Sequence, residues 1–188
     1  SSLDPHKAER APECNVLRDL MEGLVIQDAA GNAIPGAAES WEVQGDQRFE
    51  FTLRQDARWS NGDPVTAYDF EYSFRRLADP STASPHAWYV ERARIKNARD
   101  VVSGAKDKSE LGVTAVDART LVLETDVPAP HLVQMLAHAA AYPVHKATVE
   151  RWGDAWATPE HFVSNGAYAL SGWSAAEGVV LVRNGNYW

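Results

Sequence analysis

Three histidines recur at a regular interval in the second half of the chain, and histidine is a common metal ligand and proton carrier. His131, His138 and His145 are seven residues apart, so a continuous helix would bring the first two to the same side, two turns apart. Paired metal ligands on one helix normally lie three or four residues apart, and Pro143 interrupts the chain before the third histidine. The interval therefore argues against a metal centre, and we expect none.

Other reactive residue types occur without the spacing that their chemistry requires. Segment 103–109, SGAKDKS, lacks the second glycine and the Gly-Lys-Ser ending of a phosphate-binding loop. No nucleophile-elbow, zinc-protease, redox or dinucleotide motif occurs, and no spacing selects a Ser, His and Asp as a triad. Cys14 is the only cysteine, and we interpret it as a small buried side chain under a helix rather than a reactive thiol. The sequence predicts neither an enzyme nor a cofactor site.

The overall charge excludes some classes of partner. The 26 acidic and 18 basic residues give a net charge of -8, and no block of Lys and Arg is present. Binding to nucleic acid or to an anionic membrane surface draws on such blocks, so we expect neither. The apolar runs are a few residues long, far below the roughly 20 that cross a bilayer. The amino end shows no charged segment followed by an apolar core, so we expect that any export signal was removed or lies outside this sequence.

The most informative stretch of the chain is a strand, a tight loop and a helix. Phe49, Phe51 and Leu53 alternate with polar residues, which predicts a half-buried strand. The next segment, 59–64 (WSNGDP), is rich in turn-forming residues. Thr66 with Asp69 three residues later is close to a capping box, and apolar residues then recur at helical spacing.

The periodicity of the remaining chain predicts further short elements. We expect strands 24–26 and 39–43 to join strand 49–53 in a three-stranded antiparallel meander, covered by the helix 66–77. Other expected elements are, in chain order, an extended loop 1–11, an amphipathic helix from Pro12 towards Gly23, one or two helices in 86–102, a hairpin of 112–117 with 121–125, a helix with the apolar face Leu132, Met135, Leu136 and Ala139, a helix 147–152, and a hairpin of 168–173 with 179–183.

The sequence of the central stretch closely resembles a signature of the extracytoplasmic solute-binding proteins that feed peptide and nickel ABC importers. The resemblance rests on LRQDARWSNGDPVTAYDFEYSF and on the strand Trp41-Glu42-Val43 before it. Within that family the chain is most similar to the oligopeptide-binding proteins. The resemblance extends to SLDPHKAERAPECNVLRDLMEGL near the start, to LADPSTASPHAWYV in the middle, and to SNGAYALSGW and VLVRNGNYW at the end. Family members are usually much longer, so the chain resembles a leading portion of one.

The resemblance implies a fold and a domain organisation. The expected fold class is α+β, similar to type II periplasmic binding proteins. Residues 1–23 and 142–188 would form a discontinuous, partial first lobe with a mixed sheet, and residues 24–141 an inserted small α+β domain. The second lobe, which closes over ligand in the family, would be absent from these residues.

The resemblance also implies ligand contacts. In the oligopeptide-binding proteins, the segment that matches residues 1–11 lines the groove and pairs with the peptide backbone, as an added strand would. This makes Glu9, Arg10 and Ala11 candidates, and the Glu9 carboxylate can hold a peptide amino group. Without the resemblance, Glu9 is simply a solvated loop acid. Arg10 stands where relatives often have a small residue. His86 stands where they often have an aromatic residue that touches peptide, and a histidine can stack or hydrogen-bond there.

The function implied by the resemblance is capture of oligopeptides outside the inner membrane and their delivery to an ABC importer permease. The expected location is the periplasm, or the cell surface as a lipoprotein. A murein peptide, a dipeptide or nickel is the alternative ligand within transport. A protein-interaction module outside transport, built from the retained lobe, is the alternative of another class. We expect these 188 residues alone to bind peptide weakly or not at all, and to self-associate through surface that a missing lobe would cover.

Overall fold

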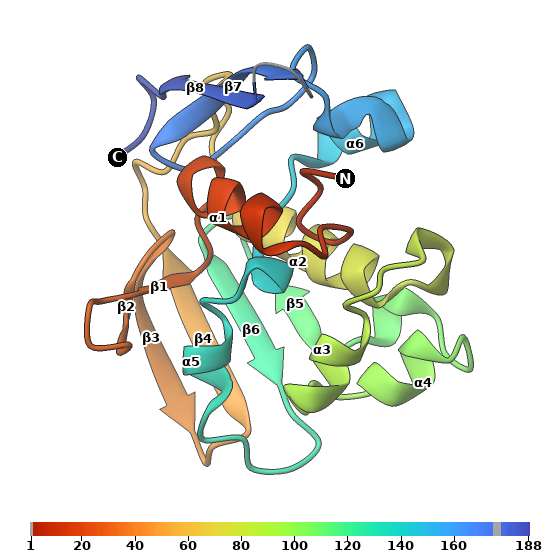
Figure 1. Ribbon diagram of the computed structural model, residues 1–188. Helices are drawn as coiled ribbons and strands as arrows, with labels where there is room; N and C mark the ends of the chain where they lie inside the picture. Colours follow the sequence, from red (N-terminus) through yellow and green to blue (C-terminus); the bar gives the residue numbers. More distant parts are fainter. Residues whose placement is uncertain (1, 175–177) are drawn as a thin grey trace.

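The computed structural model describes residues 2–174 and 178–188, and a four-stranded antiparallel sheet lies at its centre (Figure 1). Its strands follow the order β3 (Ala38–Gln44), β4 (Arg48–Leu53), β6 (Thr120–Glu124) and β5 (Val113–Ala115). The apolar side chains of β4, which are Phe49, Phe51 and Leu53, are at most 1% exposed. The predicted strand and its buried face are therefore confirmed.

Helix α2 (Ala67–Ala78) packs against β5 and β6 and covers the buried face of the sheet. Thr66 caps its first turn: the Asp69 carboxylate accepts hydrogen bonds from the Thr66 amide (2.8 Å) and hydroxyl (3.0 Å). Phe70 and Phe74, one turn apart, are fully buried beneath it. The predicted capping box and apolar helix face are both present.

The predicted three-stranded meander is wrong. Strand β1 (Val25–Gln27) pairs with β2 (Ala33–Pro35) in a separate hairpin and is not part of the central sheet. The Asp28 carboxylate accepts hydrogen bonds from the amides of Ala30 and Asn32 (2.9 and 2.8 Å), which reverses the chain immediately after β1. Strand β1 thus pairs with β2 and not with β3 as predicted, whereas the predicted pairing of β3 with β4 is present.

The predicted helix with apolar residues from Leu132 to Ala139 is only partly formed. One turn, α5 (Leu132–Met135), is followed by a 3-10 turn, η3 (Ala139–Ala141). The His138 imidazole Nδ1 caps the start of η3 by accepting a hydrogen bond from the Ala140 amide (3.1 Å). His131 and His138 each precede a short helix and do not share a helix face.

The remaining helices are short, and two of them lie within 86–102, where one or two were predicted. They are η1 (Pro80–Thr82), α3 (Trp88–Arg92), α4 (Ala98–Val102), η2 (Lys108–Glu110), α6 (Lys146–Trp152) and η4 (Gly153–Ala157). The predicted hairpins correspond to β5–β6 and to β7 (Tyr168–Ser174) paired with β8 (Gly178–Arg183). Residues 175–177 of that last hairpin, and Ser1 of the predicted amino-terminal loop, lie outside the described residues.

The amino-terminal helix and the carboxy-terminal hairpin lie side by side, above the central sheet in Figure 1. Helix α1 (Ala11–Leu20) receives a hydrogen bond at the Leu20 carbonyl from the Gly166 amide (2.9 Å). A Cβ atom at Gly166 would stand 2.6 Å from the Asp19 carbonyl oxygen, so only glycine fits this contact. The Asn165 side chain also bonds both backbone groups of Glu22 (2.9 and 2.8 Å). Residues 1–23 and 142–188 therefore pack on one another.

One hydrophobic core includes residues from both parts of the predicted domain division, such as Leu17, Leu170, Phe51 and Leu77. The division at residues 23 and 142 stays a prediction. The strand pairings within the described residues are antiparallel, and residues 142–188, for which a mixed sheet was predicted, contribute the β7–β8 hairpin. None of the helices in the described part of the chain is both long and apolar enough to cross a membrane.

Candidate functional site

The segment before α1 is fastened to the body of the protein by a buried ion pair. Arg76 of α2 donates hydrogen bonds to both carboxylate oxygens of Asp4, at 3.1 and 2.6 Å. The Trp156 indole donates a third to the same carboxylate at 3.3 Å. Although burial disfavours the charged carboxylate, the hydrogen bonds from Arg76 keep the pKa of Asp4 below its usual value. The anchor therefore persists at neutral pH.

His6 completes this anchor from the next turn of the chain. Arg76 donates to His6 Nδ1 at 2.7 Å, so this nitrogen is the acceptor and the imidazole is neutral. The side chain is fully buried, and burial lowers the pKa of His6 from 6.5 to about 4. The Ser84 hydroxyl donates to the His6 carbonyl at 2.5 Å. The loop before α3 is thereby bound to the amino-terminal segment.

Glu13, in the first turn of α1, shapes the candidate segment itself. Its carboxylate accepts hydrogen bonds from the backbone amides of Ser2 (3.3 Å), Glu9 (3.3 Å) and Arg10 (3.2 Å). A carboxylate at the start of a helix is also favoured by the helix dipole. Glu13 is 8% exposed, so these contacts lie inside the protein and hold the segment in one conformation.

The structure brings the four residues predicted from sequence to one place. Glu9, Arg10 and Ala11 are exposed, and His86 is half-buried beside them. His86 Nε2 donates to the Ala8 carbonyl at 2.6 Å, which joins the loop before α3 to this segment. Within the described residues, the Glu9 carbonyl and the Ala11 amide have no hydrogen-bond partner. They are the groups that an added extended chain could bond.

His138 and Tyr89 belong to the same surface. The His138 ring stacks on Tyr89 with centroids 5.3 Å apart and lies 6.5 Å from the His86 ring. The Tyr89 hydroxyl donates to the Met135 carbonyl, and burial raises the pKa of Tyr89 far above its usual range. Partial burial, together with the His86 imidazole, lowers the pKa of His138. The neutral form of the His138 imidazole is therefore favoured here.

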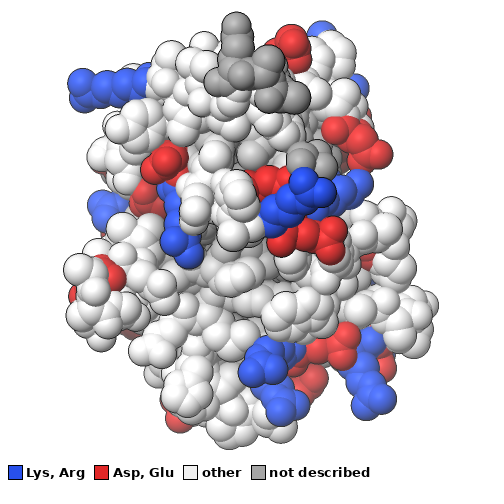
Figure 2. Space-filling view, viewed as in Figure 1, with Lys and Arg blue, Asp and Glu red and all other residues white. Residues whose placement is uncertain are grey.

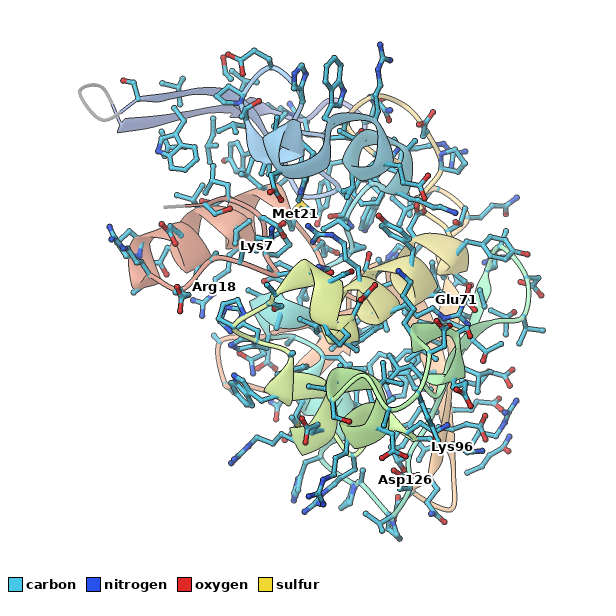
Figure 3. All side chains as sticks on the ribbon, turned by 90° about the vertical axis from the view of Figure 1, so that its right-hand side faces the viewer. Lys7, Arg18, Met21, Glu71, Lys96 and Asp126 are labelled. Carbon is cyan, nitrogen blue, oxygen red and sulfur yellow. The ribbon has the colours of Figure 1, made fainter. Side chains whose placement is uncertain are left out.

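A groove of about 310 Å³ lies between this surface and α1. Its lining includes Cys14 and Arg18 of α1 on one side, and Tyr89 and His138 on the other. Figure 3 labels Arg18. Cys14 is partly exposed here and not buried under the helix as predicted. A neighbouring groove of about 440 Å³ continues from Arg18 towards the end of the chain. Together the two grooves form a cleft along α1.

Sequence reasoning missed four of these residues: Asp4, His6, Glu13 and His138. It weighed His138 only as a metal ligand, and the fold instead places that side chain beside Tyr89. Of the four, only Glu13 had a local sequence signal: it is an acid in the first turn of a predicted helix, where capping side chains are found. In the described part of the chain, no three His, Cys, Asp or Glu side chains gather in a way that could hold a metal ion.

Comparison with known proteins identifies the family. Residues 32–188 match the family model described as bacterial extracellular solute-binding proteins, family 5 Middle. The chain belongs to this family. Its fold class is the one predicted, α+β of the type II periplasmic-binding-protein kind. The candidate residues Glu9, Arg10 and Ala11 precede the matched range, whereas His86 and His138 lie inside it.

Individual family 5 members match over the full chain. It is 48% identical to the periplasmic oligopeptide-binding protein OppA of Salmonella typhimurium, and 46% identical to the periplasmic murein peptide-binding protein MppA of Escherichia coli. These matches cover 100% of this chain and 34% and 35% of the relatives. The chain thus spans about a third of the length of the curated relatives it matches.

Solved structures of family 5 members superpose closely. The crystal structure of Haemophilus influenzae OppA in complex with RPPGFSPFR has a TM-score of 0.96 and 47% identity, covering 100% of this chain and 37% of that one. The Escherichia coli murein tripeptide binding protein MppA has a TM-score of 0.97 and 46% identity, covering 100% and 36%. Both relatives are named for binding peptides.

Proposed function

We propose that this chain supplies one wall of the peptide site in the substrate-binding component of an ABC importer, which captures oligopeptides outside the inner membrane and delivers them to the permease. The observation that carries the proposal is the exposed, clamped backbone at Glu9 and Ala11, beside His86 and His138. The peptide-binding names of the relatives support it, as does their periplasmic location.

The geometry suits recognition of a peptide backbone more than of particular side chains. An extended peptide would bond the Glu9 carbonyl and the Ala11 amide, as a strand added to an edge does. The Glu9 carboxylate would attract the peptide amino group or a basic side chain, while the exposed Arg10 would influence the edge of the groove. His86 and His138 offer ring faces and ring nitrogens to the middle of the peptide. Glu13 keeps the backbone groups in place before the peptide arrives.

The surface of the last hairpin supports the proposal that this wall works with another part. Val180 and Val182 of β8, which lie on the same face of the hairpin, are 46% and 48% exposed. Apolar side chains that gather in this way mark a contact surface. We propose that a second lobe covers it in a complete binding protein, and that the 188 residues alone self-associate there. A protein-interaction module outside transport would use the same surface.

Native mass spectrometry of the gene product from its own host tests the function first. We expect a protein that carries a mixture of short peptides, released on denaturation. A 20.7 kDa polypeptide bound to another protein and free of peptide contradicts transport and favours the interaction module.

Binding of RPPGFSPFR to the same gene product, measured by calorimetry, tests the residues. Glu9→Ala and His86→Ala should each weaken binding about tenfold, which corresponds to about 1.4 kcal/mol. Glu39→Gln, at an exposed position on β3, is the matched control and should leave affinity unchanged. Equal affinity in all three variants contradicts the assignment of Glu9 and His86.

A further inference from the structure

A second groove, of about 880 Å³, runs between α3 and the start of α5. Trp88 forms one wall and is 51% exposed, while Pro128, Pro130 and Met135 form the other. Met135 also lines the groove beneath His138, and the Trp88 ring contacts the Tyr89 ring edge-on at 6.1 Å. The α3–α5 groove therefore adjoins the candidate peptide site. Figure 1 shows α3 and α5 at the same end of the molecule, below α1.

The charge of the α3–α5 groove is opposite to that of the protein. Arg92 and Arg94 line it together with a single acid, Glu91, whereas the whole chain carries a net charge of -8. Both arginines are exposed, and neither forms an ion pair with any residue that the structure describes. Figure 2 shows basic and acidic side chains next to one another at this lower end. Two guanidinium groups without a partner, beside an exposed indole, favour a carboxylate next to an apolar side chain.

The backbone at Arg94 adds a separate argument. The Arg94 amide donates to the Glu91 carbonyl (2.9 Å) and the Ile95 amide to the Val90 carbonyl (3.1 Å), which is the Schellman ending of a helix. Arg94 takes the left-handed position of this motif, with φ of 61°, where glycine is strongly favoured. An arginine there costs conformational free energy. Residues held in such conformations cluster at functional sites.

We propose that the α3–α5 groove is an extension of the peptide site that binds the distal, carboxylate-bearing part of a longer peptide. Arg92 and Arg94 would bind the carboxylate, and Trp88 would pack on the apolar residue beside it. With the peptide amino group near Glu9, the negative end of the peptide would then meet the positive end of the cleft. The protein would prefer peptides that are acidic far from their amino terminus. This inference rests on the proposed function.

The test compares two series of octapeptides. Each peptide has Lys at its first position, an amidated carboxyl end, and Ala at the other positions except one. That one position carries Glu in the first series and Gln in the second, and it is varied along the peptide. Binding to the gene product from its own host is measured by calorimetry. We expect Glu to be favoured over Gln about tenfold at one or more positions in the second half of the peptide. The double variant Arg92→Gln with Arg94→Gln should lose this preference and keep its affinity for the Gln peptides. Arg99→Gln, exposed on α4 outside the groove, is the control and should keep the preference.

Arg94→Gly separates a binding role from a structural one. Because glycine relieves the left-handed backbone, this variant should melt at the same temperature or higher, yet lose part of the preference for Glu. A lower melting temperature shows that Arg94 supports the fold, and contradicts its role as a strained binding residue. A Glu preference that is absent at every position, or unchanged in the double variant, overturns the proposal. If neither peptide series binds the native protein, the proposed function itself fails.

Discussion

Asp4 and Arg76 lie 72 residues apart in the sequence, yet they form a bidentate ion pair that is almost entirely closed to solvent. The Asp4 side chain is 4% exposed and that of Arg76 is 11% exposed. The pair joins the segment that carries Glu9 to the helix that covers the central sheet. The position of the candidate peptide surface therefore depends on contacts beneath it.

Removing one partner of this pair should destabilise the protein strongly. Arg76→Leu leaves the Asp4 carboxylate buried beside only the Trp156 indole and local backbone, and we expect the free energy of unfolding to fall by about 3–5 kcal/mol. Urea unfolding at pH 7 measures the change. Arg119→Gln, which breaks the exposed ion pair with Glu39, is the matched control and should cost less than about 1 kcal/mol. Equal effects of the two substitutions would show that burial of the pair is unimportant.

The buried His6 should make stability fall as the pH decreases from about 6.5 to about 4. In this interval the unfolded chain binds a proton at His6, whereas the folded chain, in which the pKa of His6 is about 4, does not. The unfolded state is therefore favoured by up to about 3 kcal/mol at the lower end. Asp4 stays ionised over most of this range because its pKa is lowered, so it does not reverse the trend.

Urea unfolding at half-unit pH steps checks this expectation in the wild type and in His6→Gln. The variant lacks the titrating group, so its stability should change less between pH 6.5 and 4.5, whatever its absolute stability. Parallel curves for the two proteins would assign the acid sensitivity to other groups.

Glu13 should control how rigidly the candidate segment is held. Glu13→Ala removes the acceptor of three amides, those of Ser2, Glu9 and Arg10, at a cost of about 1–3 kcal/mol. Hydrogen exchange at Glu9 and Arg10 should become at least about tenfold faster, and RPPGFSPFR should bind the gene product more weakly. Exchange in β4, which lies in the central sheet, is the internal reference and should change little. Unchanged exchange at Glu9 and Arg10 would contradict the clamp.

The sequence by itself determined the local elements, because their signals repeat within a few residues. The alternation of Phe49, Phe51 and Leu53 predicted β4, and Thr66 with Asp69 predicted the start of α2, as the structure has them. The stretch around them also led to the family. Its resemblance selected Glu9, Arg10, Ala11 and His86, and the fold brings these residues together, although their contact with peptide stays a prediction.

Only the tertiary structure decided which distant segments meet, because no local pattern records such contacts. The Asp4–Arg76 pair joins residues from different elements, and the stack of His138 on Tyr89 depends on how two short helices end. The place of β6 beside β4, and of β1 outside the central sheet, was also undetermined, since antiparallel strands of similar composition can exchange neighbours. Long-range hydrogen bonds and shared burial select one arrangement, and that arrangement places the clamped backbone of Glu9 at the surface.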